Sequence, residues 1–213
     1  MGARLRRLAG RALALALAVG ALGCLLPALA AAQWENRIGI CLDPDRFDDR
    51  LYIGYGIFSA YFVLMSPRDA DGAAIAACSG FELRAQIWGD PGVLFRLAEE
   101  LPAGWTNALD SSDPWDASYR AGGAEPLPVS GDHVLLMTWT MLPVGGMHEL
   151  WLLPLDTPTL AGSLAYWAPA PGGDVVVGAR ASGDYFPSPE VFLNPIFDRV
   201  ENQSFGHVKA LYR

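Results

Sequence analysis

The chain has 213 residues, of which 52% are hydrophobic, and a formal net charge of −8 at pH 7. This length suits one domain with a substantial core and argues against two. The acidic balance, and the lack of a Lys/Arg cluster after residue 11, argue against nucleic acid or an anionic membrane surface as a partner.

Residues 1–32 have the composition of a secretion signal. Four arginines precede an uncharged apolar run over 12–26, and an alanine-rich stretch follows that ends at Ala32. These are the parts of a cleavable signal peptide, so we expect cleavage after Ala32 and an exported protein in the periplasm, at the cell surface or outside the cell. A transmembrane anchor needs about 20 continuous apolar residues, and Pro27 interrupts the run. A lipid anchor at Cys24 is a weaker alternative, because apolar residues follow that cysteine.

Short apolar runs separated by glycine and proline indicate an all-β domain. In chain order, strands are predicted over residues 36–42, 57–65, 81–88, 133–142, 149–153, 161–167 and 174–180. Residues 93–100 fit either a helical turn or a strand. Seven or more strands joined by turns predict a two-sheet antiparallel β-sandwich over residues 33–195, with a closed barrel as the alternative.

Period-two alternation identifies the expected core. The bulky side chains of two predicted strands fall on one face of each strand, and Trp151 also lies within an apolar strand. We therefore expect these residues to be buried together: Phe81, Leu83, Ile87, Leu135, Met137, Trp139 and Trp151.

Two cysteines, Cys41 and Cys78, follow the expected cleavage site. A lone pair of cysteines in an exported protein usually forms a disulfide. We therefore predict a Cys41–Cys78 bridge, with the two Cα atoms within about 7 Å. Two separately buried thiols are the alternative.

Catalytic motifs are missing from the sequence. The histidines His133, His148 and His207 lack the spacing of zinc ligands, and no Gly-x-Ser-x-Gly motif occurs. No catalytic residue is assigned, and a secreted hydrolase is only the third function that we consider.

An acidic loop is the one candidate for a metal site. Calcium binds carboxylates on flexible loops, and such a loop is predicted to hold Asp43, Asp45, Asp48 and Asp49. The full Asp-x-Asp-x-Asp-Gly spacing is not present. We therefore favour solvated turn residues and no cofactor, with calcium as the alternative.

Three of the seven tryptophans are candidate ligand-binding residues. Trp105 and Trp115 flank a polar loop, and Trp167 ends a predicted strand. Exposed aromatic rings can stack on sugars, which makes these rings candidates for a small carbohydrate ligand. Rings that cap the ends of the sandwich are the alternative.

From Arg37 to about Pro195 the chain resembles a group of secreted bacterial β-sandwich domains and, more distantly, cohesins and carbohydrate-binding sandwiches. The similarity rests on Ile-Gly-Ile near the start, AYFVLMSP, Gly-Phe-Glu-Leu, and EPLPVSGD leading into VLLMTWTML. It implies a non-catalytic module and transfers no catalytic or binding residue. Cohesins bind a dockerin partner, but no dockerin-like calcium repeat is visible in this chain.

The last ten residues are similar to a C-terminal tail of exported bacterial proteins, Ser-Trp-Gly-x-Val-Lys-x-Leu-Tyr-Arg, with Phe205 at the tryptophan position. This similarity implies a tail over 196–213 in which Phe205 to Arg213 is read by sorting machinery. The alternative is a short helix that packs Phe205, Val208 and Leu211 onto the sandwich.

Together these features predict a non-catalytic exported module that acts in extracellular or cell-surface structure, adhesion or ligand binding. Its expected partner is a protein or a glycan at the cell surface. A carbohydrate-binding domain that uses Trp105, Trp115 and Trp167 is the alternative.

Overall fold

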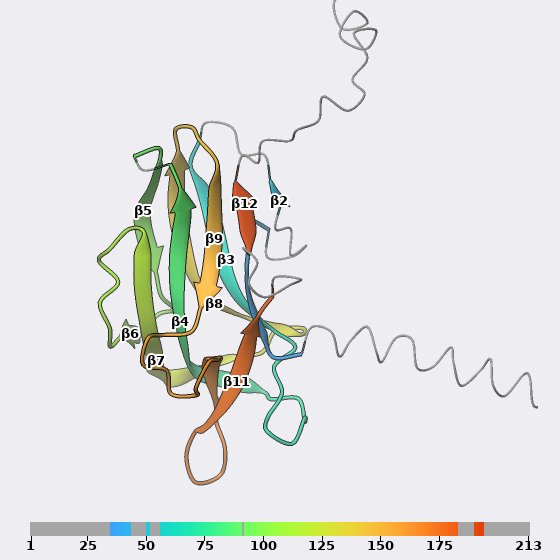
Figure 1. Ribbon diagram of the computed structural model, residues 1–213. Coiled ribbons are helices and arrows are strands. Elements are labelled where there is room, and N and C mark those ends of the chain that lie inside the picture. Colours follow the sequence, from blue (N-terminus) through green and yellow to red (C-terminus); the bar gives the residue numbers. More distant parts are fainter. Residues whose placement is uncertain (1–34, 44–49, 52–55, 91, 183–189, 194–213) are drawn as a thin grey trace, which may run out of the picture.

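The described residues of the computed structural model are all-β, as predicted, with twelve strands and no helix (Figure 1). The structure describes residues 35–43, 50–51, 56–90, 92–182 and 190–193. The expected signal peptide over 1–32 and the expected tail over 196–213 lie outside this part of the chain. Within it, no helical segment is long and apolar enough to cross a bilayer.

The strands form two layers (Figure 1). The small sheet has the order β1-β3-β8-β5; its strands are β1 (Arg37–Cys41), β3 (Phe58–Met65), β5 (Leu94–Glu100) and β8 (His133–Pro143). The large sheet contains β2 (Arg50–Leu51), β4 (Ala77–Gly89), β6 (Trp105–Asn107), β7 (Asp116–Pro128), β9 (His148–Leu153), β10 (Leu164–Ala168), β11 (Val175–Ala181) and β12 (Val191–Leu193). The ambiguous segment 93–100 is therefore mostly strand.

The long strand β4 organises the large sheet. It pairs antiparallel with β7 along one edge and with β10 and then β9 along the other. Two pairs are parallel, β2 with β12 and β1 with β11. Because β1 belongs to the small sheet, its pairing with β11 joins the two layers into one curled sheet.

Side chains from both layers meet in one core. Tyr119 of β7 faces Trp139 of β8 with ring centroids 6.4 Å apart, and Phe62 of β3 meets the same tryptophan edge-on at 4.9 Å. Five of the six residues predicted to share the core on strands 81–88 and 133–142 are buried, namely Phe81, Leu83, Ile87, Met137 and Trp139.

Leu135 is the exception, and its predicted burial is wrong. Phe62 pairs with Met137 and Val63 with Leu135, so Leu136 is an extra residue in β8. A β-bulge of this kind shifts the alternation of side chains by one position. As a result Leu136 is buried and Leu135 is 43% exposed.

β7 is not among the predicted strands, and two glycines interrupt its pattern of side chains. A Cβ atom on Gly123 would lie 2.4 Å from the Trp105 ring, and one on Gly122 would lie 2.9 Å from the Ser79 carbonyl oxygen. Trp105 also donates its indole N–H to the Glu125 carbonyl at 3.1 Å. The glycines therefore permit the close packing of β6 and β4 against β7.

Candidate functional site

Two tryptophans lie on the outer side of the large sheet. The buried residues of β9 are Leu150 and Leu152, so Trp151 points outward, and its predicted core position is wrong. Trp88 of β4 is 53% exposed on the same side. The register pairs Gln86 with Trp151, which places the two tryptophans diagonally across neighbouring strands. Their ring centroids are 5.0 Å apart and the rings are tilted by 32°.

Hydrogen bonds hold both indoles in place. Trp88 donates its Nε1–H to Gln86 Oε1 at 3.1 Å, and Trp151 donates to Glu149 Oε2 at 3.0 Å. We call this group the tryptophan face, defined by Trp88, Trp151, Gln86 and Glu149. Because the rings are already oriented, a ligand that stacks on them loses little additional side-chain entropy.

A chain of polar contacts continues from Gln86 across the sheet. Gln86 donates to Asp116 Oδ2 at 2.9 Å, and Arg84 binds the same carboxylate from Nε at 2.6 Å. Arg84 also donates from Nη1 to Asp156 at 2.8 Å. The hydrogen bond from Arg84 holds the pKa of Asp116 below its ordinary value, so this carboxylate is ionised at neutral pH.

The opposite half of the same outer surface is covered. Glu82 of β4 accepts hydrogen bonds from the N–H and the hydroxyl of Thr159, each at 2.7 Å, and from Arg120 Nε at 2.8 Å. The side chain of Glu82 is buried as a result. The Thr159 loop therefore confines the accessible surface to the half that carries Trp88.

A buried ion pair closes the side of the sandwich between β5 and β7. The nearly buried Arg96 guanidinium lies 4.8 Å from the centre of the Trp139 ring and 3.5 Å from Glu99. It donates to Tyr119 Oη at 3.1 Å. Tyr119 donates in turn to Glu99 at 2.5 Å and accepts the Trp139 indole N–H at 2.9 Å. Burial, together with the hydrogen bond to Glu99, raises the pKa of Tyr119 far above its ordinary value.

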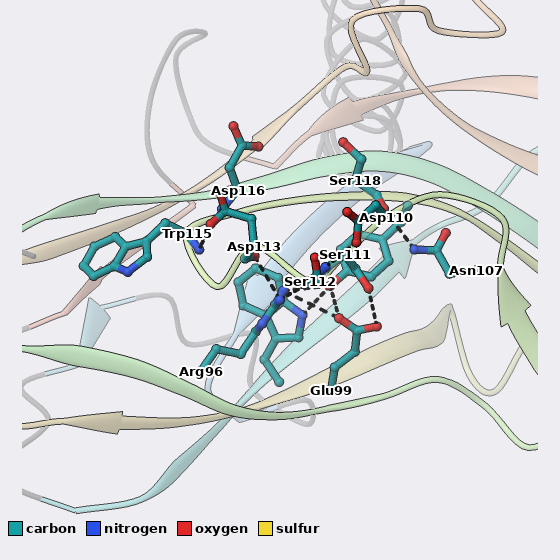
Figure 2. A network of polar contacts seen from close by, with 12 residues as sticks. Arg96, Glu99, Asn107, Asp110, Ser111, Ser112, Asp113, Trp115, Asp116 and Ser118 are labelled. Carbon is teal, nitrogen blue, oxygen red and sulfur yellow. Dashed lines mark hydrogen bonds and ion pairs between the residues drawn. The ribbon is translucent and has the colours of Figure 1, made fainter. Parts of the chain in front are cut away.

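The same ion pair fixes the loop between β6 and β7. Figure 2 shows Arg96 and Glu99 directed toward this loop. Arg96 donates to the carbonyls of Ser111 and Asp113, and Glu99 accepts from the Ser111 hydroxyl at 2.9 Å. Asp113 Oδ1 accepts the main-chain N–H of Trp115 at 2.8 Å. The network is therefore structural, and it holds the chain that leads directly into Asp116.

The structure does not gather the three tryptophans predicted to bind ligand on one surface. Trp105 is buried and stacks on Phe81 at 6.1 Å. Trp115 packs against the core beside the His148 ring, also at 6.1 Å. Trp167 is partly buried on β10 and lies close over Gly80. The exposed Trp88 and the half-buried Trp151, which sequence reasoning did not select as ligand-binding residues, form a tilted pair on the outer surface instead.

The predicted disulfide is wrong for this structure, in which Cys41 and Cys78 are separate buried thiols. Cys41 lies on the outer side of the small sheet beside Val63 and Met65, whereas Cys78 belongs to the main core. Burial raises the pKa of Cys41 to about 12 and that of Cys78 to about 11. Because the thiolate is the reactive form, both cysteines are expected to be inert in the folded protein.

Little of the predicted metal loop can be placed. Asp43 follows β1, while Asp45, Asp48 and Asp49 lie outside the described residues. Across the part of the chain that is described, no three His, Cys, Asp or Glu side chains gather as metal ligands would.

Neither of the two described histidines belongs to the tryptophan face. His148 is buried, with Nε2 3.2 Å from the Asp90 carbonyl oxygen. His133 begins β8 in the other sheet. His207 lies outside the described residues.

No protein-family model matches this chain, and no curated protein matches it. Among solved structures it is similar to a cohesin module from a family 33 glycoside hydrolase of Clostridium perfringens, with a TM-score of 0.40 and 11% sequence identity. The similarity covers 68% of this chain and 96% of the cohesin module.

Proposed function

We propose that this protein is a non-catalytic exported binding module that holds a carbohydrate on the tryptophan face. The observation that carries the proposal is the hydrogen-bonded pair of the exposed Trp88 and the half-buried Trp151 on the outer surface of the sheet. Sugar rings present C–H groups that pack on indole rings, while their hydroxyls bond to amide and carboxylate groups of the kind supplied by Gln86 and Glu149.

The charge of this surface favours one class of sugar. Asp116 and Asp156 pair with the Arg84 guanidinium, and Glu149, which binds the Trp151 indole, adds a third carboxylate to the same outer surface. Like charges across an interface are unfavourable. A neutral or amino sugar is therefore favoured over a uronic acid or a sulfated sugar.

The polar groups of the face suit recognition better than catalysis. Glu149 is bonded to the Trp151 indole, and Asp116 is held by Arg84 and Gln86. A general acid or base must reach the proton that it transfers. These two carboxylates instead orient the rings and the neighbouring side chains.

The proposal is tested with the chain lacking residues 1–32 on a glycan array, with calcium and with EDTA. We expect binding to a neutral or amino glycan in both conditions. The best glycan is then titrated by calorimetry into Trp88→Ala, which should bind at least about tenfold more weakly. Phe95→Ala is the matched control, because Phe95 is an aromatic residue of the small sheet that is 43% exposed.

Three results would contradict the proposal. The first is an array without any bound glycan. The second is a Trp88→Ala variant that binds like the unmodified chain. The third is binding that EDTA abolishes, which would move the ligand away from the tryptophan face and toward a calcium site.

A further inference from the structure

One edge of β8 is only partly covered by its neighbour. β3 pairs with β8 from His133 to Met141, but β5 pairs with it only from Thr138 onward. The turn between Ser130 and His133 closes the other end of this edge through two main-chain hydrogen bonds. Within the described residues, no strand pairs with the edge over 134–137.

The main chain of Leu135 faces this gap. Both main-chain groups of His133 bond to Ser130, on the edge away from β3. In antiparallel sheets the residues that bond across a given edge alternate along the strand. The N–H and C=O of Leu135, two residues further on, therefore point to the same edge, where they can pair with an added strand.

A cleft of about 420 Å³ lies at this gap. Val134, Leu135 and Met137 all line it, although Leu135 is exposed whereas Val134 and Met137 are buried. A space lined by residues whose side chains point to opposite faces of a strand lies beside the edge of that strand. Apolar residues form the opposite wall, including Leu101, Pro102, Leu127 and Pro128.

β5 cannot itself continue into the gap. The strand ends at Glu100, and Pro102 accepts a turn hydrogen bond from the N–H of Trp105 at 3.0 Å. Proline has no N–H to donate to a neighbouring strand. The chain therefore turns toward β6 and leaves the edge of β8 uncovered.

We propose that a partner protein binds here through an extended segment of about four residues, which adds to β8 as a short strand in line with β5. One apolar side chain of the segment enters the cleft between Leu135 and Leu127. The exposed carboxylate of Glu100 lies at one end of the gap. A segment with Lys or Arg at the end that lies beside Glu100 therefore has the complementary charge.

The test selects from a phage library of random twelve-residue peptides on the chain lacking residues 1–32. The strongest peptide is then made synthetically, and its affinity is measured with two variants. Leu135→Asp should weaken binding at least about tenfold. Leu97→Asp is the matched control, since Leu97 is a 50% exposed leucine of β5 that does not line the cleft, and it should bind normally.

Two further measurements report on the main chain rather than on side chains. The Leu135 amide should exchange its hydrogen more slowly when the peptide is bound. Two versions of the peptide are made, one N-methylated at the odd and the other at the even residues. Only one of the two sets of N–H groups faces β8 in an added strand, so one version should lose binding and the other should keep it.

The proposal is overturned if the library yields no binder, if Leu135→Asp binds like Leu97→Asp, or if both N-methylated peptides bind normally. A dimer in light scattering that Leu135→Asp dissociates would also overturn it, because the occupant would then be a second copy of the chain. Trp88→Ala should leave peptide binding unchanged, which keeps this test separate from that of the tryptophan face.

Discussion

Trp139 and Trp88 make the same kind of hydrogen bond in opposite surroundings. Trp139 donates its indole N–H to Tyr119 at 2.9 Å, and Trp88 donates to Gln86 at 3.1 Å. Trp139 is fully buried under the Arg96 guanidinium, whereas Trp88 keeps half of its surface in solvent. The difference shows that a fixed orientation serves packing in one case and leaves a prepared surface in the other.

The largest effect is expected from removing the buried ring. Trp139→Ala should lower the free energy of unfolding by about 3–5 kcal/mol, because it leaves a cavity between the two sheets and removes one of the hydrogen bonds of the Tyr119 hydroxyl. Urea denaturation followed by circular dichroism measures the loss. A change below about 1 kcal/mol would mean that the ring is not the centre of the core.

Breaking the ion pair beside Trp139 should have the next largest effect. Arg96→Met leaves the mostly buried Glu99 carboxylate without its cation, and it should cost about 3 kcal/mol in the same denaturation experiment. The double variant Arg96→Met, Glu99→Leu should recover part of this loss, since no uncompensated charge remains. A double variant less stable than Arg96→Met would contradict this electrostatic reason.

The covered half of the outer surface should show a smaller, pH-dependent effect. Burial raises the pKa of Glu82, but hydrogen bonds from Thr159 and Arg120 outweigh it and hold the pKa below the ordinary 4.5. A carboxyl group whose pKa is lower in the folded than in the unfolded chain stabilises the fold at pH values above its unfolded-state pKa. This stabilisation is lost as the pH falls through the folded-state pKa.

Glu82→Gln should therefore cost about 1–2 kcal/mol at neutral pH. The difference from the unmodified chain should shrink near pH 3, because this lies below the ordinary pKa of 4.5 and the unfolded chain gains a proton at Glu82 more readily than the folded one. Urea denaturation at both pH values measures it, with Glu100→Gln on the exposed end of β5 as the control. A difference that stays constant with pH would show that the ionised form of Glu82 is not what matters.

The smallest effect on stability is expected from a substitution on the accessible half of the outer surface, which carries Trp88. Trp88→Ala should cost no more than about 1 kcal/mol, mainly the stacking on Trp151. The same variant should lose glycan binding, so the two readouts separate a binding role from a structural one. A loss as large as that of Trp139→Ala would instead make Trp88 part of the packing.

The positions of the strands were largely predictable from the sequence, whereas the face of the sheet on which each side chain lies was predictable only in part. The period-two pattern around Phe81 and Leu83 identified the inward face of β4. The pattern failed at Leu135, because the β-bulge that shifts the side chains by one position cannot be recognised from the alternation of residues in the sequence. It also failed at Trp151, because β9 has apolar residues on both faces and the tryptophan is the bulkier choice.

The candidate site required information that no local pattern contains. Trp88 shares its phase along β4 with Arg84 and Gln86, which already indicated an outward ring. Its partner Trp151 lies 63 positions further along the chain, and only the register between β4 and β9 brings the two together. A tryptophan in phase with polar residues is the signal that could have selected Trp88.

The parallel pairing of β1 with β11 has a mechanical consequence. If the chain is pulled ahead of β1 and beyond β11 in opposite directions, the two strands are drawn lengthwise past each other. The main-chain hydrogen bonds from Arg180 to Asn36 at 2.9 Å and from Ser182 to Ile38 at 3.0 Å then bear the tension together, in shear, rather than opening one after another. The pairing of β1 with β11, which joins the two layers, is therefore where the folded chain should resist stretching.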